Sequence, residues 1–220
     1  MYNIEVSNAN EAFVRLFSYV KDCGQKVGDT RACFDVGVQI LNPADRLIIC
    51  PWRKWSKVYA EREWAWYLSK NRSVVELKKY APIWDTMHSG DNIVNSNYGW
   101  QWSRNEQLLK CIEQLRNNKN TRQAWVTIYD GKEKDSYEFD TPCTLSVGFS
   151  VVDNRLNISV LMRSNDLVYG FCNDQYCFSK LQELVASELD LKMGTYFHYA
   201  HNMHIYENKL NLKNEFDRHN

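Results

Sequence analysis

Apolar residues recur at helical spacing in four segments of the chain. Within each segment they fall three or four positions apart, which places them on one face of an amphipathic helix. The predicted helices cover residues 11–20, 53–70, 105–115 and 175–189. In the second helix the apolar positions are Val58, Ala60, Trp64 and Tyr67. We expect these side chains to face a core.

Other segments are short runs of β-branched and apolar residues, a pattern that predicts strands. They cover residues 31–40, 123–130, 144–152 and 156–163, with a short final strand through 204–208. Asp153-Asn154 is typical of a hairpin turn. This order of helices and strands predicts an α+β fold with a mostly sequential sheet. Because no linker or repeat interrupts the chain, we expect residues 1–220 to form a single domain.

Charge and composition exclude several classes of protein. The chain has 27 basic and 27 acidic residues and no basic tract, so direct nucleic-acid binding is not expected. The N-terminus carries early acids and no apolar run, unlike a signal peptide. No stretch approaches the roughly 20 apolar residues of a membrane span. We therefore expect a cytoplasmic protein with no membrane partner.

The seven cysteines are an odd number and contain no CxxC pair. In a reducing cytosol most of them should be small buried hydrophobic residues. Zinc binding lacks the paired short spacings that it requires, so no metal is expected. Cys143 differs from the other cysteines in its sequence context, because it follows Pro142 at the start of a predicted strand. It is either a buried structural residue or an exposed thiol.

The densest run of unusual residues covers 162–178, between a predicted strand and a helix. Arg163 is followed by Ser164, Asn165 and Asp166, and an Arg beside a Ser is a phosphate-binding pair. Gly170 is expected to let the backbone turn sharply, and Asn173 or Asp174 to cap the next helix. A plain strand-to-helix corner is the alternative interpretation.

A further polar cluster lies near the C-terminus and consists of His198, His201, His204 and Tyr206. This cluster could suggest a metal site, but no carboxylate or cysteine lies at ligand spacing. Hydrogen bonding to a sugar is an equally good interpretation.

Taken in order, these segments resemble the thymidylate synthase superfamily. The matching features are Pro142-Cys143, then Arg163-Ser164-x-Asp166, then Gly170 with Asp174, and then His204-Ile-Tyr206. Upstream, Glu63 in EWAWYL and the segments 83–87 and 95–102 also match, so the resemblance covers about residues 26–208. It implies a mixed, twisted sheet flanked by helices, in a homodimer that packs sheet to sheet. Within the superfamily, the phage-type deoxycytidylate hydroxymethylases look most similar.

The resemblance assigns a role to each matching residue. Cys143 would be the nucleophile that adds to C6 of a pyrimidine, and Arg163 would bind the phosphate and lower the thiol pKa. Glu63 would organise water and proton transfer, or else lie on a solvated helix face. The remaining contacts are Ser164 to phosphate, His204 and Tyr206 to the sugar, Tyr98 to the nucleotide, and Asp166, Trp84 and Met87 on the folate side.

Two phosphate contacts are less clear from the resemblance. Arg122 would reach the phosphate bound by the partner subunit, although Gln123 stands where the family usually has a second Arg. Near the N-terminus, Lys26 would be the loop residue that binds phosphate, with Arg31 as the competing position.

Asp174 indicates which base is bound. Thymidylate synthases have Asn at the matching position, and a side-chain amide complements uracil. Cytosine presents an N3 acceptor and a 4-amino donor, which a carboxyl group that shares a proton with N3 satisfies. Asp174 therefore favours cytosine, unless it is only a helix cap or Asn173 takes its place.

The reaction would transfer the one-carbon unit of 5,10-methylenetetrahydrofolate to C5 of dCMP. Water addition would give 5-hydroxymethyl-dCMP, and hydride transfer from the folate would give 5-methyl-dCMP. Hydride transfer requires a dry site, whereas the family's bulky Trp is Met87 here and the chain ends fourteen residues after Tyr206. Both differences favour hydroxymethylation. A dUMP-directed enzyme and an inactive regulator that binds nucleotide or RNA are the alternatives.

A modified cytosine in the nucleotide pool is typical of a virus that disguises its DNA. The sequence therefore suggests a phage enzyme that works in the host cytoplasm.

Overall fold

The computed structural model describes residues 2–219. Its strands are β1 (Tyr2–Val6), β2 (Gln25–Val27), β3 (Thr30–Ile40), β4 (Trp125–Thr127), β5 (Thr144–Val152), β6 (Arg155–Asp166) and β7 (Lys192–Tyr206). Its α-helices are α1 (Ala9–Cys23), α2 (Lys57–Ser69), α3 (Tyr98–Ser103), α4 (Gln107–Asn117), α5 (Cys172–Glu188) and α6 (Leu212–His219).

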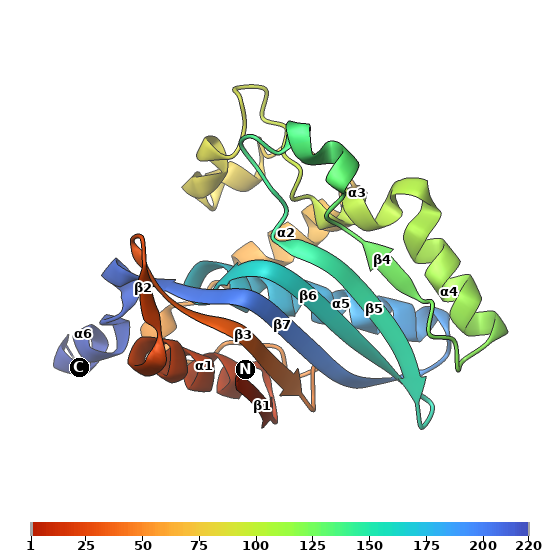
Figure 1. Ribbon diagram of the computed structural model, residues 1–220, viewed down its shortest axis with the longest axis horizontal. Helices are drawn as coiled ribbons and strands as arrows, with labels where there is room; N and C mark the ends of the chain where they lie inside the picture. The colour runs from red at the N-terminus through yellow and green to blue at the C-terminus, as the bar shows by residue number, and fades with distance from the viewer. Residues whose placement is uncertain (1, 220) are drawn as a thin grey trace.

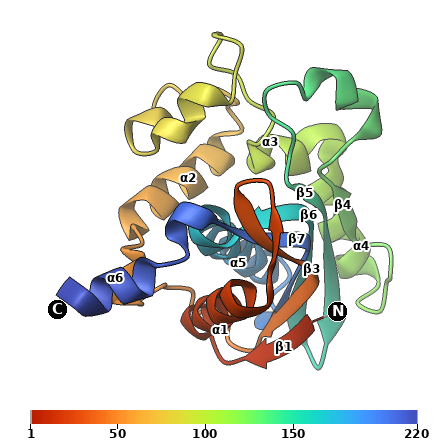
Figure 2. The ribbon, with the colours of Figure 1, turned by 60° about the vertical axis from the view of Figure 1, so that its left-hand side comes forward.

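The strands form one mixed sheet in the order β1-β3-β7-β6-β5-β4, with β2 paired to β3. The β1–β3 and β6–β7 pairs are parallel, and the other pairs are antiparallel. The sheet twists visibly from one edge to the other (Figures 1 and 2). This arrangement confirms the predicted α+β fold with a mixed, twisted sheet flanked by helices.

Helices cover one face of the sheet. Helix α1 contacts β3 and β7, α5 contacts β6 and β7, and α4 contacts β4 and β5. Helices α2 and α3 contact each other, and α2 also contacts α5, so these two helices add a further layer near one end of the sheet (Figure 1). The main core lies between the sheet and this helical side, where every second strand residue is buried.

The opposite face of the sheet carries no helix (Figure 1). Phe34 is 42% exposed and Trp125 is 46% exposed, and both are large apolar side chains. Phe197 and Tyr199 on β7 are partly exposed. A broad apolar sheet face that stays open in a single chain is suited to packing against a second protein surface.

The predicted helices at 11–20, 105–115 and 175–189 correspond to α1, α4 and α5 and are confirmed. The prediction for 53–70 was wrong at its beginning, because α2 begins at Lys57 with Ser56 as its N-cap. The Ser56 side chain accepts a hydrogen bond from the Tyr59 amide, as Ser commonly does at this position. Val58 is 62% exposed, so it does not belong to the apolar face.

The strands at 31–40, 144–152 and 156–163 are confirmed, and Asp153 and Asn154 both have the positive φ of a tight hairpin turn. The run at 123–130 was predicted too long, because β4 covers only Trp125–Thr127. The final strand was predicted too short, since β7 has 15 residues and runs through the centre of the sheet. The strands β1 and β2 were not predicted.

One line across the sheet interrupts the regular pairing. Pairing lapses at Asp35, His201 and Arg163 on neighbouring strands, and the register shifts by one residue between Thr144 and Ser146. Asp35 has a φ of 55°, outside the β region. Irregularities of this kind bend a strand and redirect the side chains that follow.

The interruption reverses which residues face the helical side. On β7 the buried residues are Tyr196, His198 and Ala200 before it, but Met203 and Ile205 after it. On β6 the buried residues before it are even-numbered, up to Met162, and the next one after it is Asn165. Asn165 therefore points toward the helices at the end of the sheet where the candidate site lies.

Candidate active site

The strand directions bring four separate segments to one end of the sheet. Cys143 directly precedes β5, and because β5 runs antiparallel to β6, Cys143 lies near the end of β6. The parallel β6–β7 pair sets Asp166 opposite His204, and Thr30 at the beginning of β3 is opposite Tyr206. The predicted nucleophile and most of the predicted nucleotide contacts therefore lie at this end of the sheet.

Arg163 is held against the turn that contains Cys143. Its Nε donates to the Pro142 carbonyl at 3.0 Å, and its Nη2 donates to the Thr141 carbonyl at 2.8 Å. The same Nη2 lies 3.8 Å from Cys143 Sγ. Nη1 makes no hydrogen bond with the described residues, so one edge of the guanidinium is available for an anion.

Arg163 lowers the Cys143 pKa as expected, but the net pKa of this thiol is raised. The thiol is partly buried, and desolvation raises its pKa to about 11. The Arg163 guanidinium lowers that pKa, but only in part, and the carboxylates of Asp174, Asp140 and Asp166 oppose it. The Cys143 thiol is therefore protonated at neutral pH unless a further interaction lowers its pKa.

Asp174 lies inside a helix and does not cap one. The chain leaves β6 through a single π-helical turn, Leu167–Phe171, and its cap is Asp166, whose Oδ1 accepts hydrogen bonds from the amides of Val168 and Tyr169. Helix α5 follows directly. The prediction that Asn173 or Asp174 caps the helix was therefore wrong, because Asp166 already satisfies the free amides.

Asn173 and Asp174 point to different partners. The Asn173 side chain accepts a hydrogen bond from Trp55 Nε1 at 2.8 Å and donates to the Tyr169 carbonyl. Asp174 Oδ2 accepts from Asn165 Nδ2 at 2.7 Å. Burial raises the Asp174 pKa to about 7, although the Asn165 hydrogen bond lowers it. Near neutral pH this carboxyl group can therefore be present in both protonation states.

Gly170 has a different role from the one expected. Its φ is not positive, so it does not make a turn that only glycine allows. Instead, a Cβ at this position would lie 2.9 Å from Asn165 Nδ2 and 3.2 Å from Asp174 Oδ2. Gly170 therefore leaves room for the hydrogen bond between these two side chains.

Glu63 is buried on the inner face of α2, so it does not belong to a solvated helix face. Tyr67 donates a hydrogen bond to its Oε1 at 3.3 Å. Desolvation raises the Glu63 pKa to about 8, and the Asp174 carboxylate adds to this effect. Glu63 Oε2 and Thr144 Oγ1 are buried and have no hydrogen-bond partner among the described residues. Buried polar atoms without partners at one site fit a polar ligand.

The outer part of the site is more exposed and has fewer contacts. His204 Nδ1 donates one hydrogen bond, to Asn202 Oδ1 at 3.0 Å, and its ring contacts Tyr206 edge-on. Tyr206 is 37% exposed. Ser164 is partly exposed and pairs through its backbone with Asn202. These side chains are free to take a ligand.

The structure separates the predicted histidine cluster. His198 is fully buried, His201 contacts Asp35 at 3.0 Å, and His204 lies at the outer part of the site. Across residues 2–219, no group of three or more His, Cys, Asp or Glu side chains is arranged to hold a metal ion. Within the same range, no helix is long and apolar enough to cross a membrane.

The two candidate phosphate contacts near the N-terminus differ in direction. Lys26 is on the exposed β2–β3 hairpin, and its Nζ lies 3.6 Å from Glu207 Oε2, next to Tyr206. Arg31 Nη1 donates to the Lys21 carbonyl at the end of α1 at 3.4 Å. Lys26 is therefore the one whose charged group lies beside the site.

Arg122 is far from the site of its own chain. Ala124, two residues after Arg122, accepts a hydrogen bond from the Phe149 amide, and Phe149 lies six residues along β5 from Cys143, which is roughly 20 Å at the rise of an extended strand. The Arg122 side chain is exposed. Arg122 therefore does not belong to the candidate site of its own chain.

Trp84 and Met87 belong to a second, smaller cluster with Val74, Leu77 and Val94. Trp84 Nε1 donates to the Tyr59 hydroxyl at 3.0 Å, which connects this cluster to α2. Tyr98 is buried and stacks on Phe178.

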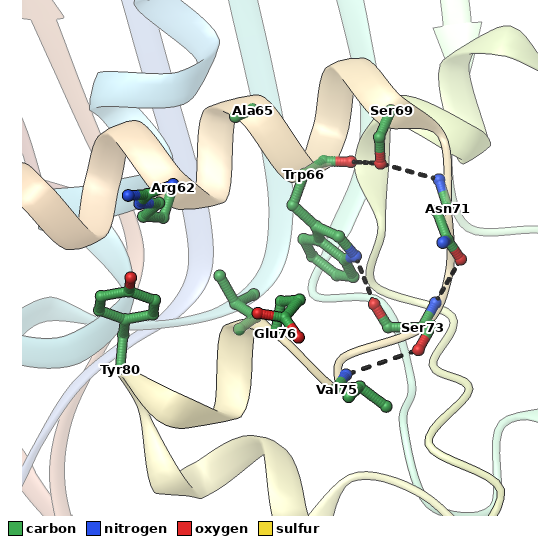
Figure 3. Close-up of a pocket in the computed structure, with 10 residues that line it drawn as sticks. Arg62, Ala65, Trp66, Ser69, Asn71, Ser73, Val75, Glu76 and Tyr80 are labelled. Carbon is green, nitrogen blue, oxygen red and sulfur yellow. Dashed lines mark hydrogen bonds between the residues drawn. The ribbon is translucent and has the colours of Figure 1, made fainter.

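A pocket of about 340 Å³ lies between the outer face of α2 and residues 71–80 (Figure 3). It is lined by Arg62, Trp66 and Tyr80, among others, and Trp66 Nε1 donates to the Ser73 carbonyl. None of the predicted site residues lines it, since Glu63 and Tyr67 are on the inner face of the same helix. This pocket is therefore separate from the candidate active site.

The thymidylate synthase family matches residues 25–219, most of the chain. The chain belongs to this family. It is 33% identical to the deoxycytidylate 5-hydroxymethyltransferase of Enterobacteria phage T4 over 174 residues, which cover 70% of this chain and 69% of the relative. It is 30% identical to the thymidylate synthase of Clostridium beijerinckii over 164 residues, which cover 73% of this chain and 62% of that relative.

Members of the thymidylate synthase family are folate-dependent one-carbon transferases that use methylenetetrahydrofolate as a co-substrate. The protein is therefore an enzyme of this type and binds a nucleotide and a folate. Cys143 and Arg163 lie together at one end of the sheet, and Asp174 on α5 is joined to β6 through Asn165.

The sequence did not predict the side chains that surround and hold Cys143, Arg163 and Asp174. No role was predicted for Asn165, and His198 was considered only as a metal or sugar ligand. Tyr67 and Thr144 were not considered for the site. The one available signal was the position of Asn165 between Ser164 and Asp166 in a chemically dense segment.

Proposed function

We propose that this protein is a dCMP hydroxymethylase with a single catalytic domain over residues 1–220. It would transfer the one-carbon unit of 5,10-methylenetetrahydrofolate to C5 of dCMP with addition of water. The observation that carries the proposal is the Asp174 carboxyl group, which is held by Asn165 and has a pKa of about 7. Such a group can donate a proton to cytosine N3 and accept a hydrogen bond from the 4-amino group.

Cys143 is proposed as the nucleophile that adds to C6, which makes C5 electron-rich. The free thiol has a pKa of about 11, so a proton acceptor or the approach of the nucleotide must promote its ionisation. Arg163, fixed 3.8 Å from the sulfur, would stabilise the thiolate and bind the phosphate with its free edge. Asp174 would stabilise the negative charge that moves toward N3.

Glu63 is proposed to handle protons and water at the base. Its pKa of about 8 allows it to both give and take a proton near neutral pH. Its partnerless Oε2 and the hydroxyl of Thr144 can hold a water molecule or a substrate atom. The folate supplies the electrophilic carbon, and His204, Tyr206 and Ser164 would hold the sugar and phosphate.

Met87 supports hydroxymethylation over methylation. Its side chain is partly buried beside Trp84, and it fills less space than the Trp of the family. A less tightly filled folate side admits water more readily. Methylation of dCMP, or a dUMP-directed reaction, is the second candidate, because bacterial thymidylate synthases match the chain at similar identity.

We further propose a homodimer that packs the open sheet faces together. The exposed Phe34 and Trp125 would be covered in such a dimer, and Arg122 would reach the phosphate site of the partner. The relatives from phages suggest that the enzyme works in the host cytoplasm.

The test is incubation with methylenetetrahydrofolate and either dCMP or dUMP, followed by mass spectrometry of the nucleotide. A dCMP product heavier by CH₂O, formed with tetrahydrofolate, supports the proposal. A dCMP product heavier by CH₂, formed with dihydrofolate, would replace it with the methylation reaction. Conversion of dUMP alone would contradict the role given to Asp174.

A further inference from the structure

A row of buried hydrogen bonds runs from β7 to Asp174. The Tyr196 hydroxyl lies 3.0 Å from His198 Nδ1, and His198 Nε2 lies 3.1 Å from Asn165 Oδ1. Asn165 Nδ2 then donates to Asp174 Oδ2 at 2.7 Å. Tyr196 and His198 are fully buried, Asn165 is 2% exposed, and only Asp174 retains partial exposure. We call these four residues the relay.

The burial of His198 determines which group donates and which accepts in each hydrogen bond of the relay. Desolvation lowers its pKa to about 3, so the ring is neutral and carries a single N–H. The Tyr196 hydroxyl has no other hydrogen-bond partner among the described residues, so it must donate to Nδ1. The proton of the ring is then on Nε2 and is donated to Asn165 Oδ1. This fixes the Asn165 amide with its NH₂ toward Asp174.

The opposite direction would be costly. Asn165 would then donate to His198 Nε2, and His198 Nδ1–H would donate to the Tyr196 oxygen. The Tyr196 proton would have no acceptor at a position with no solvent access. A buried donor without a partner costs about 1–3 kcal/mol, so the first direction is the stable one.

A neutral carboxyl group does not by itself distinguish cytosine from uracil. If one oxygen carries the proton, the carboxyl group donates to N3 and accepts from the 4-amino group of cytosine. If the other oxygen carries it, the group accepts from N3–H and donates to O4 of uracil. The Asn165 NH₂ makes Oδ2 an acceptor, which leaves Oδ1 as the oxygen that carries the proton. The proposal places Oδ1 toward N3 of the base, which is the arrangement that suits cytosine.

We propose that Asn165, oriented by His198 and Tyr196, is a positioning residue that fixes which oxygen of Asp174 carries the proton, and thereby makes this carboxyl group specific for cytosine. The inference rests on the proposed function, since it explains how the proposed base reader rejects uracil. Gly170 supports it, because the backbone approaches the Asn165–Asp174 hydrogen bond so closely that a Cβ would lie 2.9 Å from Asn165 Nδ2.

The main experiment measures the dissociation constants of dCMP and dUMP by calorimetry without folate, for the wild type, Asn165→Ala and Tyr196→Phe. In Asn165→Ala the preference for dCMP should fall at least about tenfold, equivalent to 1.4 kcal/mol. In Tyr196→Phe it should fall in the same direction by a smaller factor. General damage to the fold weakens the binding of both nucleotides equally and leaves the ratio of their dissociation constants unchanged.

Tyr199→Phe is the matched control. It removes a hydroxyl from the other face of β7, where Tyr199 donates to Asp35, and it should leave the dCMP to dUMP ratio at the wild-type value. A wild type that prefers dCMP, together with an unchanged ratio in both relay variants, overturns the inference alone. A wild type that prefers dUMP overturns the proposed function.

The direction of the relay is tested without any nucleotide. In ¹⁵N-histidine-labelled protein, the His198 ring signal is assigned by its disappearance in His198→Gln, and it should not titrate between pH 5 and 8. We expect protonated Nε2 and unprotonated Nδ1. Protonated Nδ1 would overturn the inference even if Asn165→Ala does not fold.

Discussion

Two parts of the active site differ in how firmly their side chains are held in place before a ligand binds. The floor is formed by Glu63, Asn165, Asp174 and His198. Hydrogen bonds join Asn165 to Asp174 and to His198, and burial strongly shifts the pKa values of Glu63, Asp174 and His198. The rim, formed by Lys26, Ser164, His204 and Tyr206, is more exposed and has few contacts. In the proposed site, base recognition would rely on groups that the folded chain already holds in place, whereas the sugar and phosphate contacts of the rim would form only when the nucleotide binds.

The difference has a physical reason. Reading a base requires a fixed order of donors and acceptors, and such an order is maintained only where water cannot replace a partner. A phosphate is a strong and symmetrical anion, so a mobile cation such as Lys26 can assist the fixed guanidinium of Arg163 in binding it. Variants in the floor should change chemistry and specificity, and variants in the rim should change affinity for every nucleotide alike.

The largest effect is expected at Cys143, which lies between floor and rim. Cys143→Ala should reduce turnover to the background rate, because no other group can add to C6. Affinity for dCMP should stay within about threefold of the wild type, because floor and rim are unchanged. Product formation is followed by mass spectrometry and binding by calorimetry. Normal turnover would refute the nucleophile assignment.

Glu63→Gln tests the floor through both activity and stability. Turnover should fall by about 10²–10⁴-fold, the usual contribution of a positioned acid–base group. Burial raises the Glu63 pKa from 4.5 to about 8, so between these pH values the folded chain keeps a proton that the unfolded chain has lost. The free energy of unfolding of the wild type should therefore fall as the pH rises through this range.

In Glu63→Gln this loss of stability should be smaller, because glutamine does not titrate. Urea unfolding at pH 5 and pH 8 measures the difference. Equal pH dependence in the variant and the wild type would show that Glu63 is not buried in the way described here.

Asp174→Asn should change the base preference of the floor. An amide complements uracil, so the ratio of kcat/KM for dCMP to that for dUMP should shift by about 100-fold toward dUMP. The comparison is sharpened by the rim variant Tyr206→Phe, which should weaken both substrates by a similar factor. An unchanged preference in Asp174→Asn would contradict the role of the carboxyl group.

Arg122 tests whether a second subunit completes the rim. Arg122→Ala should weaken nucleotide binding by roughly tenfold through loss of one phosphate contact. When Arg122→Ala and Cys143→Ala chains are mixed, half of the dimers are hybrids with one intact site. At dCMP concentrations well below KM, where the weaker binding of Arg122→Ala limits its rate, the activity should therefore rise to about a quarter of the wild-type value. No recovery after unfolding and refolding the chains together would argue against a shared site.

The smallest effect is expected at Met87. Met87→Trp should fill more of the folate side and exclude some water, which favours hydride transfer over water addition. We expect a few-fold rise in the fraction of 5-methyl product, measured by mass spectrometry alongside dihydrofolate formation. If this fraction does not rise, Met87 does not control the access of water.

The sequence predicted the parts of this fold that depend on local pattern. The helices α1, α4 and α5 have apolar residues at the spacing of a buried helix face, and β5 and β6 are joined by a turn with a local signature. Cys143, Arg163 and Asp174 were predicted through the resemblance to thymidylate synthases, because their own segments left a buried cysteine and a strand-to-helix corner as alternatives. Burial of Glu63 agrees with the aromatic residues around it on α2.

Only the tertiary structure decided how these parts act together. The length of β7 depends on pairing with both β3 and β6, which are distant in the sequence. The line of irregular pairing that turns Asn165 inward exists only where strands meet. The Cys143 pKa depends on burial by the whole chain, which outweighs the neighbouring Arg163. Local periodicity shows which residues can form an element, but desolvation and strand register are properties of the assembled fold.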